Sequence, residues 1–220
     1  MQNTLKEARH FLGIKDGVTD AELDNKILDT LKEISEKFPA RQYYRLFDLK
    51  KHSVGFELSG TGLILEGDTA EKMLCDCQKI AVFAVTLGST FDSYLRRLQA
   101  MDLSKAFIAD ACAGALAEKA CDELQDKIKK AVKPRFITDR FSPGYGDLPL
   151  EIQKNVSDIL NLSRILGIHV DETYTMNPLK SVTAFIGISD TAQGAKIRGC
   201  EYCTLKDSCT LRKGGKSCAK

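Results

Sequence analysis

Two neighbouring stretches decide the fold: residues 79–88, KIAVFAVTLG, and residues 104–132, SKAFIADACAGALAEKACDELQDKIKKAV. The first is a short apolar run that ends at a glycine, which is typical of a buried strand. The second is long, has no internal proline or break, and stops just before Pro134, so it predicts a long helix. Its first half is rich in alanine and glycine, and small residues allow a helix to approach a sheet closely. A sheet with a long helix packed on it is therefore expected.

The remaining pattern mixes helices and strands without regular alternation. Thr19 and Glu22 form a capping box that opens an amphipathic helix running to about Phe38, with Leu23, Ile27, Leu31 and Ile34 at helical spacing. A second amphipathic helix is expected over residues 150–166. Further strands are expected at 43–49, 53–58, 63–65 and 181–188, and residues 136–141 are expected to be extended. This order favours an α+β fold in which helices flank a mostly antiparallel, twisted sheet. We expect one domain over residues 1–195, whose residues 1–40 form an N-terminal helical part, and a separate tail over residues 196–220.

Composition narrows the class of protein. The 220 residues carry a net charge of +2, which gives no electrostatic footprint for nucleic acid. No segment has the length and apolarity of a signal peptide or a membrane span, so a cytoplasmic protein without nucleic-acid or membrane partners is expected. The sequence contains no nucleophile-elbow, Walker or zinc-protease motif, so no motif in it indicates hydrolytic catalysis.

One segment has the residue types of a ligand-binding turn: Arg140-Phe-Ser-Pro-Gly-Tyr-Gly-Asp147. An arginine can pair with a carboxylate through two parallel hydrogen bonds. The Pro-Gly turn is expected to expose backbone amides, and the Tyr145 ring could cover an apolar or aromatic ligand face. An amino-acid-like or nucleoside ligand would suit this set. A surface turn with an incidental arginine is the alternative.

At this point the sequence resembles the activation domain of vitamin B12-dependent methionine synthase, in a free-standing form. The family has an Arg-x-x-x-Gly-Tyr turn and, downstream, a Met-x-Pro-x-x-Ser-Val block. It also has an alanine-rich helix with an Ala-Glu step and a helix between the turn and the block. The matches lie between about residues 75 and 190. Arg140, Gly144 and Tyr145 match the turn, and Met176, Pro178, Ser181 and Val182 match the block. Ala117 and Glu118 match the Ala-Glu step, and the helix expected at 150–166 lies between the turn and the block.

The resemblance implies a set of binding residues for S-adenosylmethionine (AdoMet). Arg140 would pair with the carboxylate of the methionyl group, and Glu118 would lie near the ammonium or ribose end. The backbone around Ser142 and Gly144, with Tyr145, would hold the ligand along the turn. No side chain is expected to act as a general acid or base, because the family's chemistry belongs to the cofactor.

The resemblance also implies an accessory role in methyl transfer rather than a complete enzyme. A donor such as flavodoxin or ferredoxin would reduce cob(II)alamin, and AdoMet would then remethylate it. The chain has no counterpart of the family's cobalamin-binding part. The cobalamin would therefore be held by a partner, either a corrinoid-binding methionine synthase or another corrinoid protein.

The tail carries a second candidate site. Its four cysteines, Cys200, Cys203, Cys209 and Cys218, could complete a tetrathiolate shell for an iron–sulfur cluster or zinc. Residues 196–220 contain seven basic and two acidic residues, and this excess of positive charge would favour the thiolate form of the cysteines. A redox or free-thiol tail and incidental cysteines remain alternatives. The rival function is thus an iron–sulfur or zinc-tailed electron-transfer or adaptor protein that binds no AdoMet.

The other four cysteines are expected to be core thiols: Cys75, Cys77, Cys112 and Cys121. Cys112 and Cys121 are nine residues apart on one predicted helix, which places them on opposite faces and excludes a bridge between them.

Overall fold

The computed structural model describes residues 2–15 and 17–193. The chain divides into two compact units, and each unit is assembled from three separate stretches. Unit 1 comprises Met1–Tyr43, Ala84–Leu124 and Asn161–Val182, and unit 2 comprises Tyr44–Phe83, Gln125–Leu160 and Thr183–Lys220. The expectation of one domain over 1–195 followed by a tail over 196–220 stays a prediction, because the tail lies outside the described residues.

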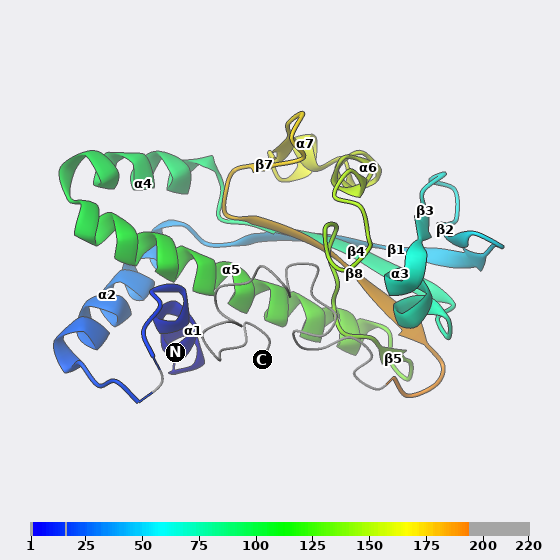
Figure 1. The fold of residues 1–220 in the computed structure, drawn as a ribbon, viewed down its shortest axis with the longest axis horizontal. Helices are drawn as coiled ribbons and strands as arrows, with labels where there is room; N and C mark the ends of the chain where they lie inside the picture. The colour runs from blue at the N-terminus through cyan, green and yellow to red at the C-terminus, as the bar shows by residue number, and fades with distance from the viewer. Residues whose placement is uncertain (1, 16, 194–220) are drawn as a thin grey trace. The chain divides into compact units, whose positions relative to one another are not determined.

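Six strands form the main sheet, in the order β3-β2-β1-β4-β8-β5 (Figure 1). Antiparallel pairing joins β1 to β2, β2 to β3 and β5 to β8. A separate two-stranded sheet pairs β6 with β7. The strands are β1 (Arg41–Lys51), β2 (Gly55–Leu58), β3 (Ile64–Glu66), β4 (Lys79–Thr86), β5 (Phe136–Ile137), β6 (His169–Val170), β7 (Met176–Asn177) and β8 (Ser181–Ser189). The predicted α+β fold with a mostly antiparallel sheet is confirmed.

The two stretches that decide the fold form the predicted elements. In β4, every residue after Lys79 is buried, which is why its sequence is a continuous apolar run. The long helix α5 spans Leu103–Ala131. Its alanines are almost all buried, so the small side chains serve close packing.

Unit 1 is mainly helical and has one core. Its helices are α1 (Gln2–Phe11), α2 (Ala21–Lys37), α4 (Ser89–Met101) and the short α7 (Leu162–Ile165), with the first part of α5. The core residues include Ile27, Leu31 and Ile34 of α2 and Phe91 of α4, packed with the alanines of α5. The amphipathic spacing read from α2 therefore identified the buried face correctly.

The start of α2 differs in detail from the predicted capping box. Asp20, not Thr19, is the N-cap residue, and its carboxylate accepts the N–H of Leu23 at 3.0 Å. A carboxylate at this position also interacts favourably with the helix dipole.

The helix predicted over 150–166 is two helices, α6 (Ile152–Leu160) and α7. Asn161 lies between them in the left-handed region, with φ of 52°. Asparagine tolerates this conformation better than most residues, and no interruption of the apolar spacing announces it. A continuous helix was therefore the wrong prediction here.

Unit 2 contains α3 (Gly67–Leu74), which packs against β2 and β3, and α6. A buried polar pair fixes α6 to β8 within this unit. The Gln153 amide donates to Thr183 Oγ1 at 2.8 Å, and the Thr183 hydroxyl donates back to Gln153 Oε1 at 3.0 Å. Both side chains are buried and their hydrogen bonds are reciprocal, so neither carries the cost of an unsatisfied polar group.

The four cysteines of the described residues differ in burial. Cys112 and Cys121 are buried, as predicted for core thiols. Cys77 is half-buried, and its thiol lies 3.6 Å from the carbonyl of Met73. Cys75 is exposed at the end of α3, so its assignment to the core was wrong. It directly follows an apolar helix face, and a helical pattern alone does not show where that face stops.

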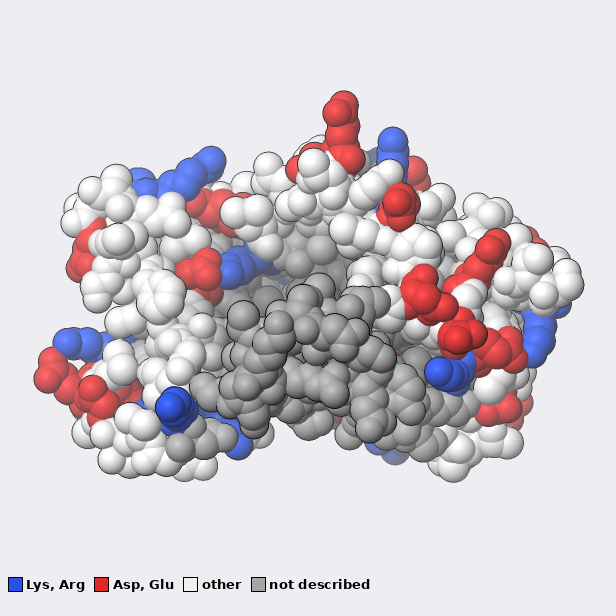
Figure 2. Space-filling view, viewed as in Figure 1, with Lys and Arg blue, Asp and Glu red and all other residues white. Residues whose placement is uncertain are grey.

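Acidic and basic side chains both occur across the described residues of the face in Figure 2. No helix among these residues has the length and apolarity needed to cross a membrane.

Candidate functional site at the Arg140 turn

The Arg140 turn is held at its first end by β8 of unit 2. Phe141 bridges to Phe185, because the N–H of Phe141 donates to the Phe185 carbonyl at 3.1 Å and the return bond is 2.8 Å. The two rings also pack, with centroids 5.5 Å apart. Just upstream, the N–H of Thr138 donates to Gly187, and its hydroxyl accepts the N–H of Gly187. Arg140 is thus carried on backbone that is fixed on both sides.

Hydrogen bonds within the turn close it into a compact loop. The N–H of Tyr145 donates to Ser142, the N–H of Leu148 donates to Tyr145, and the N–H of Gly144 donates to Leu148, all at 3.0–3.1 Å. The amides of Gly144 and Tyr145 are therefore used inside the loop, which corrects the expectation that the turn exposes them. The carbonyl oxygens of Ser142 and Tyr145 already accept one N–H each, whereas the Gly144 carbonyl is not used in these loop bonds. A carbonyl oxygen has two lone pairs, so each can accept a further hydrogen bond from a ligand's ammonium, amine or hydroxyl group.

Gly144 is exposed and has φ of 83°, a conformation that side chains with Cβ rarely adopt. A methyl group there would also press on Leu150, at 3.2 Å. Glycine therefore avoids both a strained backbone and a close contact with Leu150 at this position.

Four of the five predicted AdoMet residues lie together in this turn: Arg140, Ser142, Gly144 and Tyr145, all in unit 2. Arg140 is half-buried, and its Nη1 donates to Gln125 Oε1 at 3.4 Å. Glu118 is half-buried on α5, in the stretch assigned to unit 1. Its predicted place beside the ligand stays a prediction.

The Met176–Val182 block lies in unit 1 and has a structural role there. Ser181 Oγ lies 2.8 Å from Thr86 Oγ1 and 2.6 Å from the Pro178 carbonyl. The N–H of Leu179 donates to the buried Asp92 carboxylate at 2.9 Å. Lys180 pairs with Asp110 of α5 at 2.9 Å. The block thus fastens the start of β8 to the end of β4 and to α4.

Sequence reasoning assigned no role to Asp147, the last residue of the quoted turn. Its carboxylate accepts the backbone N–H of Asp68 at 2.6 Å and of Thr69 at 2.9 Å, at the N-terminus of α3. Hydrogen bonds from the Thr69 hydroxyl and from these amides hold the pKa of the Asp147 carboxyl below its ordinary value. The signal for such a residue is at the start of α3. Glu66, the N-cap residue, makes no side-chain capping hydrogen bond, so the first N–H groups of α3 need an acceptor from elsewhere in the chain.

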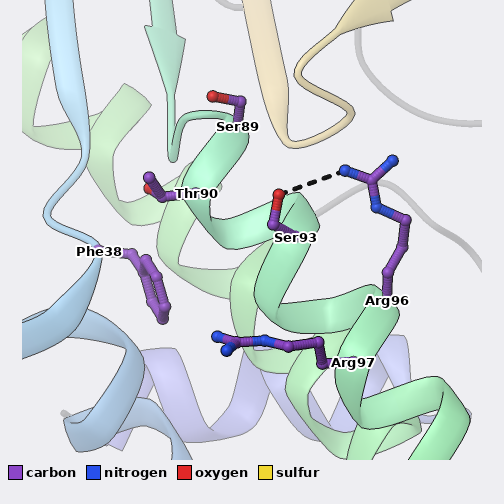
Figure 3. A pocket seen from close by; sticks show the side chains of 6 residues that line it. All are labelled: Phe38, Ser89, Thr90, Ser93, Arg96 and Arg97. Carbon is purple, nitrogen blue, oxygen red and sulfur yellow. Dashed lines mark hydrogen bonds between the residues drawn. The ribbon is translucent and has the colours of Figure 1, made fainter.

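A separate open hollow of about 650 Å³ lies beside α4 in unit 1 (Figure 3). Its lining combines Phe38 with hydroxyl groups and two arginines, and Arg96 donates to Ser93 Oγ at 3.3 Å. The lining residues are Phe38, Ser89, Thr90, Ser93, Arg96 and Arg97. None of them was predicted as a site residue.

The described residues contain no group of three or more potential metal ligands. The predicted ligands Cys200, Cys203, Cys209 and Cys218 lie outside the part of the chain that the structure describes.

The chain thus folds as an α+β domain whose Arg140 turn is anchored to β8 and to the start of α3. Comparison with known proteins makes the class specific. The family of vitamin B12-dependent methionine synthase activation domains matches residues 68–212, about two thirds of the chain. The chain belongs to this family.

A solved structure supports the fold. The structure described as the MetH reactivation domain bound to AdoHcy superposes with a TM-score of 0.66 over 98% of this chain and 82% of that chain, at 14% identity. No curated protein matches the chain. The resemblance inferred from the two motifs is thus confirmed, and the family match extends beyond the described residues to include Cys200, Cys203 and Cys209.

Proposed function

We propose that this activation domain binds AdoMet at the Arg140 turn and presents its methyl group to cobalamin held by a separate corrinoid protein. The observation that carries the proposal is the anchored loop, which groups a guanidinium, the exposed glycine Gly144 and an aromatic ring in one segment. The AdoHcy bound in the structurally similar reactivation domain supports the same ligand class.

The residues of the turn fit AdoMet in charge and shape. Arg140 supplies a cation for the methionyl carboxylate, and a charge-assisted pair of this kind is directional. Carbonyl oxygens at Ser142 and Gly144 can accept from the ammonium or the ribose hydroxyls. The Tyr145 ring offers a face for the adenine. Glu118 would complete the set as a partner for the ammonium or ribose.

The protein's own contribution would be positioning. After a separate donor has reduced the partner's cobalamin by one electron, the bound AdoMet would supply its sulfonium methyl group to the cobalamin, and AdoHcy would leave. Holding the methyl group in line with the cobalt would make the transfer effectively unimolecular. The entropy lost in bringing the two reactants together is a large part of such a barrier, and it would already be lost on binding. The chain is thus an accessory component of methyl transfer, with a flavodoxin or ferredoxin as the proposed donor.

Calorimetric titration of AdoMet and AdoHcy into the full chain tests the binding step. We expect saturable heat for both ligands and none for methionine or adenosine alone at the same concentration. Absence of heat and of a thermal shift at millimolar AdoMet would reject the proposal. Mixing the loaded chain with a reduced corrinoid methionine synthase that lacks its own activation domain then tests the transfer, read as methylated corrinoid.

The tail site is proposed separately. Cys200, Cys203, Cys209 and Cys218 would hold an iron–sulfur cluster or zinc, and the spectrum and metal content of anaerobically purified protein test this. Colourless protein without zinc or iron would reject a metal in the tail.

A further inference from the structure

The N-terminus of α3 is completed by a residue that lies far away in the sequence. The backbone N–H groups of Asp68 and Thr69 both donate to the Asp147 carboxylate, one to each oxygen. In return, the N–H of Asp147 donates to Thr69 Oγ1 at 3.3 Å. The first N–H groups of a helix have no partner within the helix, so Asp147 performs for α3 what a local capping residue usually performs.

Glycines on both sides bring the two backbones together. A Cβ at Gly67 would lie 2.5 Å from Asp147 Oδ2, and one at Gly146 would overlap the Thr69 hydroxyl. Both glycines also have positive φ, at 94° and 61°. Any side chain at either position would push the Asp147 carboxylate and the start of α3 apart. We call the contact among Gly67, Asp68, Thr69, Gly146 and Asp147 the α3 clamp.

The α3 clamp is the second anchor of the Arg140 turn. The first anchor is the Phe141–Phe185 bridge, which fixes the turn immediately after Arg140. Asp147 comes two residues after Tyr145. Leu148, the residue after Asp147, donates its N–H to Tyr145 and accepts the N–H of Gly144, so fixing Asp147 also restrains the tyrosine. With both ends fixed, Gly144 and Tyr145 have a defined place relative to Arg140.

We propose that Asp147 is a positioning residue for AdoMet, acting through the loop rather than by touching the ligand. This inference rests on the proposed function of the turn. When the α3 clamp is broken, the loop visits conformations in which Gly144 and Tyr145 no longer face the ligand held by Arg140. The apparent affinity then falls by the fraction of molecules that keep the binding-competent loop.

The test uses four variants of the full chain: Asp147→Ala, Asp147→Asn, Gly67→Ala and the double variant Gly67→Ala/Asp147→Ala. AdoMet affinity is measured by calorimetry on folded protein, and the free energy of unfolding is measured in parallel. We expect Asp147→Ala to weaken AdoMet binding about tenfold. Asp147→Asn keeps one acceptor oxygen, so its loss should be intermediate.

Gly67→Ala attacks the same contact from a position about 80 residues earlier in the sequence. It should weaken binding without substituting any residue of the turn, and the double variant should bind about as weakly as Asp147→Ala alone. Such non-additivity is expected when two substitutions break one contact, whereas independent losses add.

Asp171→Ala provides the matched control. Asp171 is likewise exposed and accepts two backbone N–H groups, from Thr173 at 2.8 Å and Thr175 at 3.0 Å, but it lies in unit 1. We expect a comparable loss of stability and a change in AdoMet affinity of less than about twofold.

Wild-type affinity in Asp147→Ala, or additive losses in the double variant, would overturn the inference while leaving the proposed function intact. A wild-type chain that fails to bind AdoMet would instead reject the proposed function. The two failures are therefore distinguishable.

Discussion

The two motifs that carry the family resemblance differ in how their polar groups are used. In the Met176–Val182 block of unit 1, the hydroxyl of Ser181, the amide of Leu179 and the ammonium of Lys180 are all engaged within the protein. In the Arg140 turn of unit 2, the internal bonds close the loop, while Gly144 stays exposed. The two motifs thus differ in where their hydrogen bonds go: those of the block fasten neighbouring elements of unit 1, and those of the turn close a loop.

The sharpest test of this comparison is Arg140→Ala. We expect AdoMet binding to weaken by about 1.5–3 kcal/mol, because a charge-assisted pair with the ligand carboxylate is lost. Calorimetry on folded protein measures the change, and Arg140→Lys serves as the control. Lysine keeps the charge but not the planar fork, so it should recover only part of the affinity. Unchanged affinity in Arg140→Ala would remove the ligand role of the turn.

Asp92→Ala should affect stability instead of binding. The Asp92 side chain is only 8% exposed and holds the N–H of Leu179, so its loss should lower the free energy of unfolding by about 1–3 kcal/mol. Chemical denaturation measures this loss. AdoMet affinity, corrected for the folded fraction, should stay at the wild-type value. A selective loss of affinity would break the comparison by giving the block a ligand role.

Tyr94 shows the same inward use of polar groups in unit 1. Its hydroxyl donates to Glu33 Oε1 at 3.0 Å, and burial, with this carboxylate, raises the pKa of Tyr94 to about 12 from an ordinary 10.0. The folded state therefore retains the proton longer than the unfolded state. The corresponding stabilisation is complete below pH 10.0 and is lost as the pH rises through about 12.

We expect Tyr94→Phe to be about 1 kcal/mol less stable than wild type at neutral pH, because one hydrogen bond is missing. The difference should shrink as the pH rises through the tyrosine range. Denaturation at a series of alkaline pH values measures it, with Tyr174→Phe as the control. A constant difference across this range would contradict the assignment.

The smallest effect concerns thiol reactivity rather than energy. Cys75 is exposed, whereas burial raises the pKa of the Cys112 thiol to about 12. Since the thiolate is the reactive form, alkylation at neutral pH should modify Cys75 before Cys112 and leave Cys112 untouched until the chain unfolds. Peptide mapping by mass spectrometry resolves the individual sites. Early modification of Cys112 would show that the core of unit 1 opens readily.

Much of the fold was predictable because its signals are local. Each main element is indicated by residues that are close together in the sequence. Examples are the apolar run of β4, the alanine-rich α5, and the spacing of Ile27, Leu31 and Ile34 in α2. The predictions that were wrong concern boundaries and endings. Asn161 interrupts a helix without interrupting its apolar pattern, and Cys75 lies just beyond a buried face.

For the candidate site, the sequence indicated a segment whose ligand role stays a prediction, and it missed how the segment closes. The residue types of the Arg140 turn suggested a ligand with a carboxylate, because guanidinium, glycine and an aromatic ring have well-defined uses. The expected free amides of Gly144 and Tyr145 were wrong, because the loop bonds that consume them depend on how the turn closes.

By itself, the sequence determined the fold class, the order of the main elements and the family to which the chain belongs. Only the tertiary structure decided that Asp147 completes α3, that Phe141 joins β8, and that the Met176–Val182 block serves the fold. These contacts join residues tens of positions apart. Periodicity and local propensity describe neighbours along the chain, whereas the pairing of distant polar groups is fixed only when the backbone has closed around them.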